Sequence, residues 1–200
     1  MATVSVNRAV LTWRLAVAWT WLWHFSSDQM WYEIRQLGRV ADSYTQGETP
    51  AHVLRVIAEK AEMGLGTRVL DIGCGRGSAL AYWASVFGAE PIGIEEVPAL
   101  GTATRELFKC LSISGTVIVG DFAEVEWPDV DLIYIAGTCF SPSAVGELQR
   151  RLLQSSAKTK IAVITLELPT TLFDLVDAVS VRFPWGKSML RIYEPRLNPV

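Results

Sequence analysis

From residue 50 onward, short apolar runs rich in β-branched residues alternate with longer stretches of helical periodicity. This alternation is typical of a parallel sheet whose strands are joined by helices. Each connection is also long enough for a helical crossover between parallel strands. The predicted strands span residues 68–72, 90–95, 115–119, 130–136 and 160–166, and the predicted helices span residues 50–63, 77–87, 98–111 and 142–155.

The pattern changes near the C-terminus. Two strand-like runs, residues 178–183 and 188–193, are separated by Pro-Trp-Gly-Lys, which is a hairpin signal. The predicted fold class is therefore α/β, with a Rossmann-like, mostly parallel sheet of seven strands that ends in an antiparallel hairpin. Thr49 followed by Pro50 predicts the N-cap and first turn of the first helix in this part of the chain.

The N-terminal segment is apolar and rich in tryptophan, with Arg14 as the only formal charge between residues 9 and 25. It is short for a bilayer span, which takes about 20 residues. Its tryptophans point to several sides of a helix, so protein or lipid has to cover it. We expect it either to pack against the domain or a partner chain, or to lie in a membrane interface. The predicted division is a helical segment at 1–43 and one domain at 44–200.

Composition narrows the class of protein. Half of the 200 residues are apolar and a fifth are charged, as in a single domain with a sizeable core. With a net charge of −3, the protein has no overall positive field that would attract the phosphates of a nucleic acid. Three cysteines without a CxxC pair and two histidines indicate no disulfide framework and no metal site. We therefore expect a cytoplasmic protein with neither a metal nor a nucleic-acid partner.

A glycine-rich turn follows the first predicted strand, in the sequence Asp-Ile-Gly-Cys-Gly-Arg-Gly at 71–77. Gly73, Gly75 and Gly77 let the backbone approach a ligand at the carboxyl end of the strand, where open α/β sheets bind ligands. The third glycine comes one residue too early for a dinucleotide fingerprint. Asp71 would repel a pyrophosphate but attract an ammonium group. The turn therefore predicts a nucleotide-like ligand with a cationic part.

The next two strand ends offer groups for the rest of such a ligand. Glu95 ends the second strand, where a carboxylate takes two ribose hydroxyls, with Glu96 as an offset alternative. The third strand ends before Asp121 and Phe122, a carboxylate for an exocyclic amino group and a ring for a purine. Three successive strand ends thus match three parts of one ligand.

In these three features the chain resembles the class I S-adenosylmethionine-dependent methyltransferases. Its flanking segments are similar to those of the Dot1-type protein-lysine methyltransferases and of related small membrane-associated lysine methyltransferases. The similar stretches are Tyr-Thr-Gln-Gly-Glu-Thr-Pro at 44–50, Asp-Phe at 121–122, residues 127–140 and Trp-Gly-Lys at 185–187. The resemblance implies S-adenosylmethionine as cofactor, with Tyr44, Glu48 and Thr49 in a cofactor-binding entry loop.

The acceptor side departs from this family, because Ala136-Gly137-Thr138 stands where the family has Asn-Asn-Phe. Phe140 and Trp185 are candidates for an apolar channel beside the transferred methyl group, where desolvation would lower the pKa of a lysine. Each of them is equally consistent with a core position. Thr138 would either orient the acceptor amine or cap the helix that begins near Ser141.

The expected function is in-line methyl transfer from S-adenosylmethionine to a protein lysine. Acids outnumber bases between Glu90 and Asp131, and an acidic rim would attract a lysine-bearing segment. The same acids would also suit a solvated face. Two alternatives stay open: a methyltransferase for a small molecule, and a catalytically silent cofactor-binding interaction module. If residues 9–25 lie in a membrane interface, the domain is peripheral to the cytosolic side of a membrane.

Overall fold

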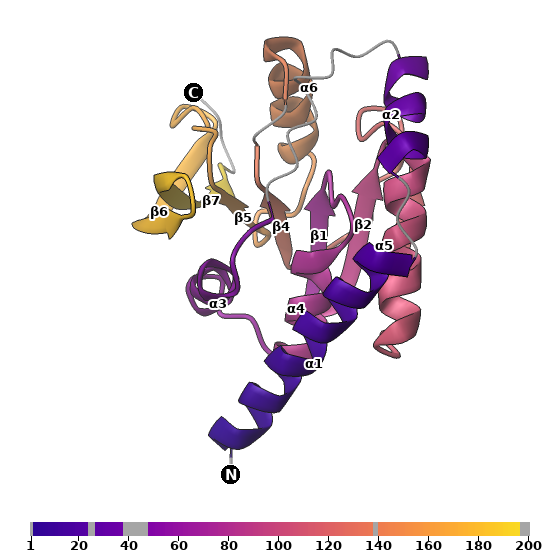
Figure 1. Cartoon of the computed structure of the whole chain (residues 1–200). Coiled ribbons are helices and arrows are strands. Elements are labelled where there is room, and N and C mark those ends of the chain that lie inside the picture. The colour runs from indigo at the N-terminus through magenta and orange to yellow at the C-terminus, as the bar shows by residue number, and fades with distance from the viewer. Residues whose placement is uncertain (1, 24–26, 38–47, 138–139, 197–200) are drawn as a thin grey trace.

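The computed structural model describes residues 2–23, 27–37, 48–137 and 140–196. A seven-stranded sheet forms its centre, in the order β3-β2-β1-β4-β5-β7-β6 (Figure 1). The first five strands are parallel and the last two add antiparallel. The predicted fold class is confirmed. The strands are β1 (Arg68–Ile72), β2 (Glu90–Glu95), β3 (Thr116–Val119), β4 (Leu132–Ile135), β5 (Lys160–Val163), β6 (Phe173–Phe183) and β7 (Gly186–Pro195).

Helices cover both faces of the sheet, which is why β1 and β4 are almost continuously apolar and buried. One face packs against α3 (Ala51–Lys60), α4 (Ser78–Phe87) and α5 (Pro98–Cys110). The opposite face packs against α6 (Pro142–Leu152), which contributes Leu148 and Leu152 to a second apolar cluster. The two clusters hold the central strands in place, so that their carboxyl ends form one rigid edge.

The C-terminal hairpin is longer than the sequence pattern predicts. β6 begins five residues earlier than expected, and a register shift between Leu175 and Asp177 interrupts its pairing with β7. This irregularity breaks the alternation of apolar and polar positions, so the first residues of the strand carry no clear period-2 signal. Val181 and Phe183 return to the regular pattern and enter the core.

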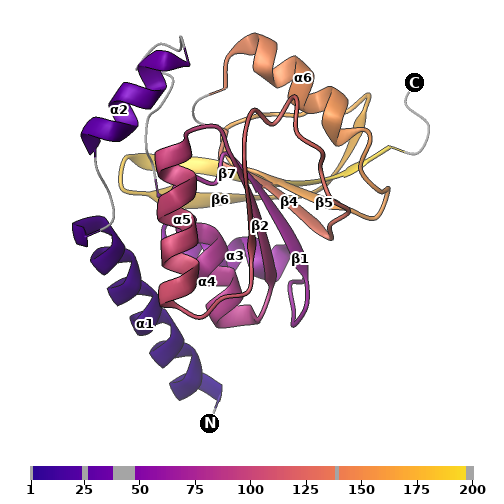
Figure 2. The same cartoon turned by 90° about the vertical axis from the view of Figure 1, so that its right-hand side faces the viewer.

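The N-terminal helix α1 (Ala2–Trp23) packs along α4 and α5 with one of its faces (Figure 2). The buried Trp13 ring meets Tyr82 edge-on, with centroids 5.2 Å apart, and its indole N–H donates to the Ser78 carbonyl at 2.9 Å. Ala16 and Thr20 are buried on the same face. Protein therefore covers one side of α1.

A second helix, α2 (Ser27–Gln36), lies within residues 1–43, which the sequence predicts as one helical segment. Its buried Met30 and Ile34 are four residues apart and pack on the start of α5. Glu33 lies between them and accepts a hydrogen bond from the Ala99 amide at 2.7 Å. Because Val97 at the N-cap of α5 has no side-chain acceptor, Glu33 supplies the cap from another helix.

Thr49 is not the N-cap that its position before Pro50 predicts. Pro50 itself occupies the N-cap of α3, and no side chain accepts a hydrogen bond there. The Thr49 hydroxyl instead bonds to the Tyr134 hydroxyl on β4 at 2.6 Å. Both residues are buried, so a tertiary contact with the sheet takes the hydroxyl that local geometry would have used for capping.

Among the helices of the described ranges, none combines the length and the apolar character that crossing a bilayer requires.

The packing of α1 predicts that Trp13→Ala lowers the free energy of unfolding by about 3 kcal/mol, since a large buried ring is replaced by a cavity. Leu15→Ala on the solvent side of the same helix is the matched control and should change it by less than about 0.5 kcal/mol. Urea unfolding of the full chain measures both. Equal, small losses would show that α1 is not part of the cooperative fold.

Candidate active site

The glycine turn joins the end of β1 to the start of α4 and is tied to the neighbouring strand. Gly73, Gly75 and Gly77 all have φ between +57° and +76°, a region that other residues adopt only with strain. The amides of Gly73 and Cys74 both donate to the Ile94 carbonyl, at 2.9 and 3.0 Å. The turn is thus fixed against β2 at the carboxyl edge of the sheet, where the sequence places it.

The three glycines face different surroundings. A Cβ atom built on Gly73 or Gly75 would meet no protein atom within 4 Å, whereas one on Gly77 would lie 2.4 Å from the Thr104 methyl carbon. Gly77 therefore allows α5 to pack, while Gly73 and Gly75 leave their backbone open to a ligand. Thr104 also donates a hydrogen bond to the Gly75 carbonyl at 2.9 Å. No sequence motif predicts this contact.

Asp71 and Glu95 lie buried beside this turn, at the ends of adjacent strands. The Glu95 carboxylate accepts hydrogen bonds from the Gly75 amide at 2.8 Å and the Val97 amide at 2.9 Å. Glu95, rather than the offset alternative Glu96, is therefore the acid that meets the glycine turn. The structure brings together the acids and glycines that the sequence selects, and their binding role stays a prediction.

The electrostatics of the pair favour a cationic ligand. Burial, with a smaller contribution from the charge of Glu95, raises the pKa of Asp71 to about 8. Burial also raises the pKa of Glu95 to about 7, although the amides of Val97 and Gly75 oppose the shift. Two carboxyl groups that ionise reluctantly in this setting would both be stabilised as anions by a nearby positive charge.

The predicted entry loop is described only from Glu48 onward; Tyr44 lies outside the described residues. Arg76 of the glycine turn donates a hydrogen bond to the Glu48 carboxylate at 3.1 Å. Burial lowers the pKa of Arg76 to about 10, and the charge of Glu48 acts in the opposite direction. Glu48 therefore reaches the glycine turn, whereas Thr49 points to Tyr134 in the core.

The turn after β3 carries Asp121 and Phe122. It is joined to β2 by the Gly120 amide, which donates to the Glu95 carbonyl at 2.9 Å. The Asp121 carboxylate accepts a hydrogen bond from the Ala123 amide at 2.8 Å. The Phe122 ring meets Phe140 edge-on with centroids 5.3 Å apart. Phe140, a candidate for the acceptor side, thus packs on the residue expected beside the purine.

Trp185 has a different environment from Phe140. It lies in the turn of the β6–β7 hairpin, is 57% exposed and stacks on Phe183 with centroids 4.7 Å apart. The two aromatic candidates therefore pack on different rings, and their role on the acceptor side stays a prediction. Thr138 lies outside the described residues, so its expected role stays a prediction.

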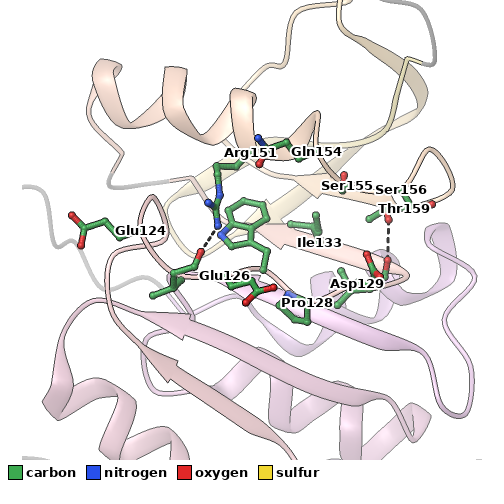
Figure 3. A pocket seen from close by; sticks show the side chains of 13 residues that line it. Glu124, Glu126, Pro128, Asp129, Ile133, Arg151, Gln154, Ser155, Ser156 and Thr159 are labelled. Carbon is green, nitrogen blue, oxygen red and sulfur yellow. Dashed lines mark hydrogen bonds between the residues drawn. The ribbon is translucent and has the colours of Figure 1, made fainter.

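A cavity of about 330 Å³ lies behind the turn after β3, on the α6 side of the sheet (Figure 3). Arg151 extends from α6 into it, donates a hydrogen bond to the Val125 carbonyl and lies 5.2 Å from the centre of the Trp127 ring. The Trp127 indole in turn donates to the Phe122 carbonyl at 2.9 Å. None of the predicted site residues lines this cavity. Trp127, which does line it, holds the Phe122 turn through this hydrogen bond.

Within the described ranges, no three or more His, Cys, Asp and Glu side chains are grouped to hold a metal ion.

Comparisons of sequence agree with this arrangement. Residues 69–158 match the family described as a methyltransferase domain. The chain is similar to protein-L-isoaspartate O-methyltransferases from Methylorubrum populi (30% identity over 137 residues) and Ignicoccus hospitalis (37% over 73). These matches cover 62% and 35% of this chain. They span 61% and 35% of the two relatives, less than two thirds of either.

Comparisons of structure show the same fold. An RNA methyltransferase from Salinibacter ruber, in complex with S-adenosyl-L-homocysteine, matches with a TM-score of 0.65 and 22% identity. That match covers 76% of this chain and 97% of the other. MtNAS in complex with MTA and tNA matches with a TM-score of 0.62 and 15% identity, over 98% of this chain and 75% of its own. The second match includes the N-terminal helices.

The different surroundings of Gly75 and Gly77 predict two different defects. Gly75→Ala should cost about 1 kcal/mol of stability through backbone strain and should weaken the binding of S-adenosyl-L-homocysteine, because its methyl group occupies the open face. Gly77→Ala adds an overlap with Thr104 to the same strain, and should cost about 2 to 4 kcal/mol. Urea unfolding and titration calorimetry measure the two effects. A Gly75→Ala protein with unchanged affinity would contradict a ligand at this turn.

The raised pKa values predict a dependence of stability on pH. Buried Asp71 holds its proton up to a pH of about 8, whereas in the unfolded chain it loses it near 3.8. The folded state therefore binds more protons, and the stability due to this group is lost as pH rises from about 4 through 8. Asp71→Asn should flatten the fall in unfolding free energy between pH 5 and 8, whereas the exposed control Asp28→Asn should not. Identical slopes in both variants would refute the assignment.

Proposed function

Because residues 69–158 match the family described as a methyltransferase domain, we propose that this chain transfers the methyl group of S-adenosylmethionine to the side-chain amine of a protein lysine. Two similar solved structures support the cofactor, since one holds S-adenosyl-L-homocysteine and a variant of MtNAS holds S-adenosylmethionine. Within this proposal residues 44–200 are the catalytic domain and residues 1–43 its N-terminal segment. The site of action is the cytosol, where the cofactor is made.

The residues at the edge of the sheet fit the parts of this cofactor. Asp71 offers a buried carboxylate to the ammonium group of the methionine moiety. Glu95 has two carboxylate oxygens for the ribose hydroxyls, beside the open backbone of Gly75. Asp121 and Phe122 suit the adenine amino group and ring. Glu48, Thr49 and Tyr44 would close the methionine end, with Gly73 and Gly77 shaping the turn.

The observation that supports a lysine acceptor is the concentration of acidic residues at the carboxyl edge of the sheet. Asp71, Glu95, Asp121 and Glu48 all belong to it, and a bound cationic cofactor would stabilise the first two as anions. Arg76, the cation within the glycine turn, is engaged with Glu48. Such a field attracts an amine and disfavours a carboxylate. It supports lysine over the carboxyl acceptor named for the protein-L-isoaspartate O-methyltransferases.

The chain's own contribution to the reaction would be alignment, exclusion of water and control of one proton. Phe140, which packs edge-on against Phe122, offers an apolar surface that, beside a positive sulfonium, would lower the pKa of the acceptor lysine so that it loses its proton to water. The neutral nitrogen then forms its bond to the methyl carbon as the carbon–sulfur bond breaks, leaving S-adenosyl-L-homocysteine. Thr138 and Trp185 complete the acceptor side of this proposal.

The test uses full-length protein, S-adenosylmethionine with a tritiated methyl group, and a cell extract as the source of acceptors. The expected result is a labelled protein band whose label survives mild alkali and is recovered as methyl-lysine after acid hydrolysis. Asp71→Asn should remove the label because the ammonium group loses its counter-charge. Asp174→Asn, which replaces an exposed acid on β6, is the control.

Other outcomes would select other functions. Label released by alkali would indicate a methyl ester, and therefore a carboxyl acceptor instead of lysine. Label confined to small molecules would favour a small-molecule methyltransferase. Cofactor binding in calorimetry without any transfer would favour a catalytically silent interaction module, and each of these results would overturn the lysine proposal.

A further inference from the structure

The outward face of α1 carries a stripe of leucines that the fold leaves in contact with water. Leu11, Leu15 and Leu22 are 58%, 63% and 79% exposed. At 100° per residue these three positions fall within about 40° of one another, opposite Trp13 and Thr20. Such a stripe is an exposed apolar surface on a helix whose other side is already packed.

The charged residues that α1 itself carries have one sign. Arg8 and Arg14 are exposed on either side of it, and the sequence of α1 contains no acidic residue. A second copy of the helix would bring four arginines together without a carboxylate from either helix to neutralise them. A surface of anionic lipid headgroups supplies the missing negative charge and also accepts the leucines.

We propose that α1 lies flat on an anionic lipid bilayer, with Leu11, Leu15 and Leu22 at the boundary of the acyl chains and Arg8 and Arg14 among the headgroups. The inner face stays on α4 and α5, so the domain is held against the membrane without any segment crossing it. This proposal is independent of the methyl acceptor, because it concerns only the outer face of α1.

The aromatic residues of this region divide between the two environments. Trp13 does not contact the membrane in this proposal, because its ring packs on Tyr82 and its indole N–H donates a hydrogen bond to the Ser78 carbonyl. On α2, which lies along the same side of the molecule (Figure 2), Trp31 and Tyr32 are 38% and 63% exposed. Such side chains suit the headgroup level.

Cosedimentation of the full-length protein with vesicles tests the proposal. We expect binding to phosphatidylcholine vesicles that contain phosphatidylglycerol, weaker binding to pure phosphatidylcholine, and release at high salt. Leu11→Gln/Leu15→Gln should weaken binding at least tenfold, because two apolar side chains are lost from the interface. Arg8→Gln/Arg14→Gln should weaken binding roughly tenfold, on the anionic vesicles only.

The matched control is Leu65→Gln/Leu175→Gln, which removes two exposed leucines outside α1 and should bind as the wild type does. Urea unfolding shows that each variant is folded. Failure of the wild type to sediment, or equal losses in both leucine pairs, would overturn the proposal. So would a lipid-free dimer, measured by analytical ultracentrifugation, that Leu11→Gln/Leu15→Gln abolishes, since a second copy would then cover the stripe.

Discussion

The burial of two carboxyl groups at the carboxyl edge of the sheet is the constraint that shapes the rest of this site. Removing Asp71 and Glu95 from water is costly unless hydrogen bonds or a positive charge compensate. The amides of Gly75 and Val97 compensate Glu95. The Gly75 amide is in position because the glycine turn is left-handed and fixed to β2, whereas the Val97 amide follows Glu95 by two residues at the start of α5.

The sequence predicts this part of the molecule well because its signals are local. Asp71, Glu95 and Asp121 each follow an apolar run, and the carboxyl ends of neighbouring parallel strands meet at one edge. The supporting contacts are harder to predict because they join distant parts of the chain. Glu33 caps an amide 66 residues away, and Thr104 reaches a carbonyl 29 residues away. Both residues belong to ordinary amphipathic helices and carry no motif.

One expectation fails because it assigns a side chain to a role from its neighbours in sequence. Thr49 precedes a proline like a typical N-cap, yet its hydroxyl bonds to Tyr134 on the sheet. The ring partners of Phe140 and Trp185, which are Phe122 and Phe183, are likewise not evident from the sequence. Tertiary packing determines which contact such a side chain makes, and a single sequence does not show which residue its partner is.

The order of α1 before its packing partners α4 and α5 in the chain also has a consequence during synthesis. The residue that accepts the hydrogen bond of Trp13 is made 65 residues later. At about 5 to 20 residues per second, roughly 3 to 13 seconds pass between the two on the ribosome. Throughout that interval the inner face of the helix lacks its partners on α4 and α5, so its apolar side chains are open to water, chaperones and membranes until the core forms.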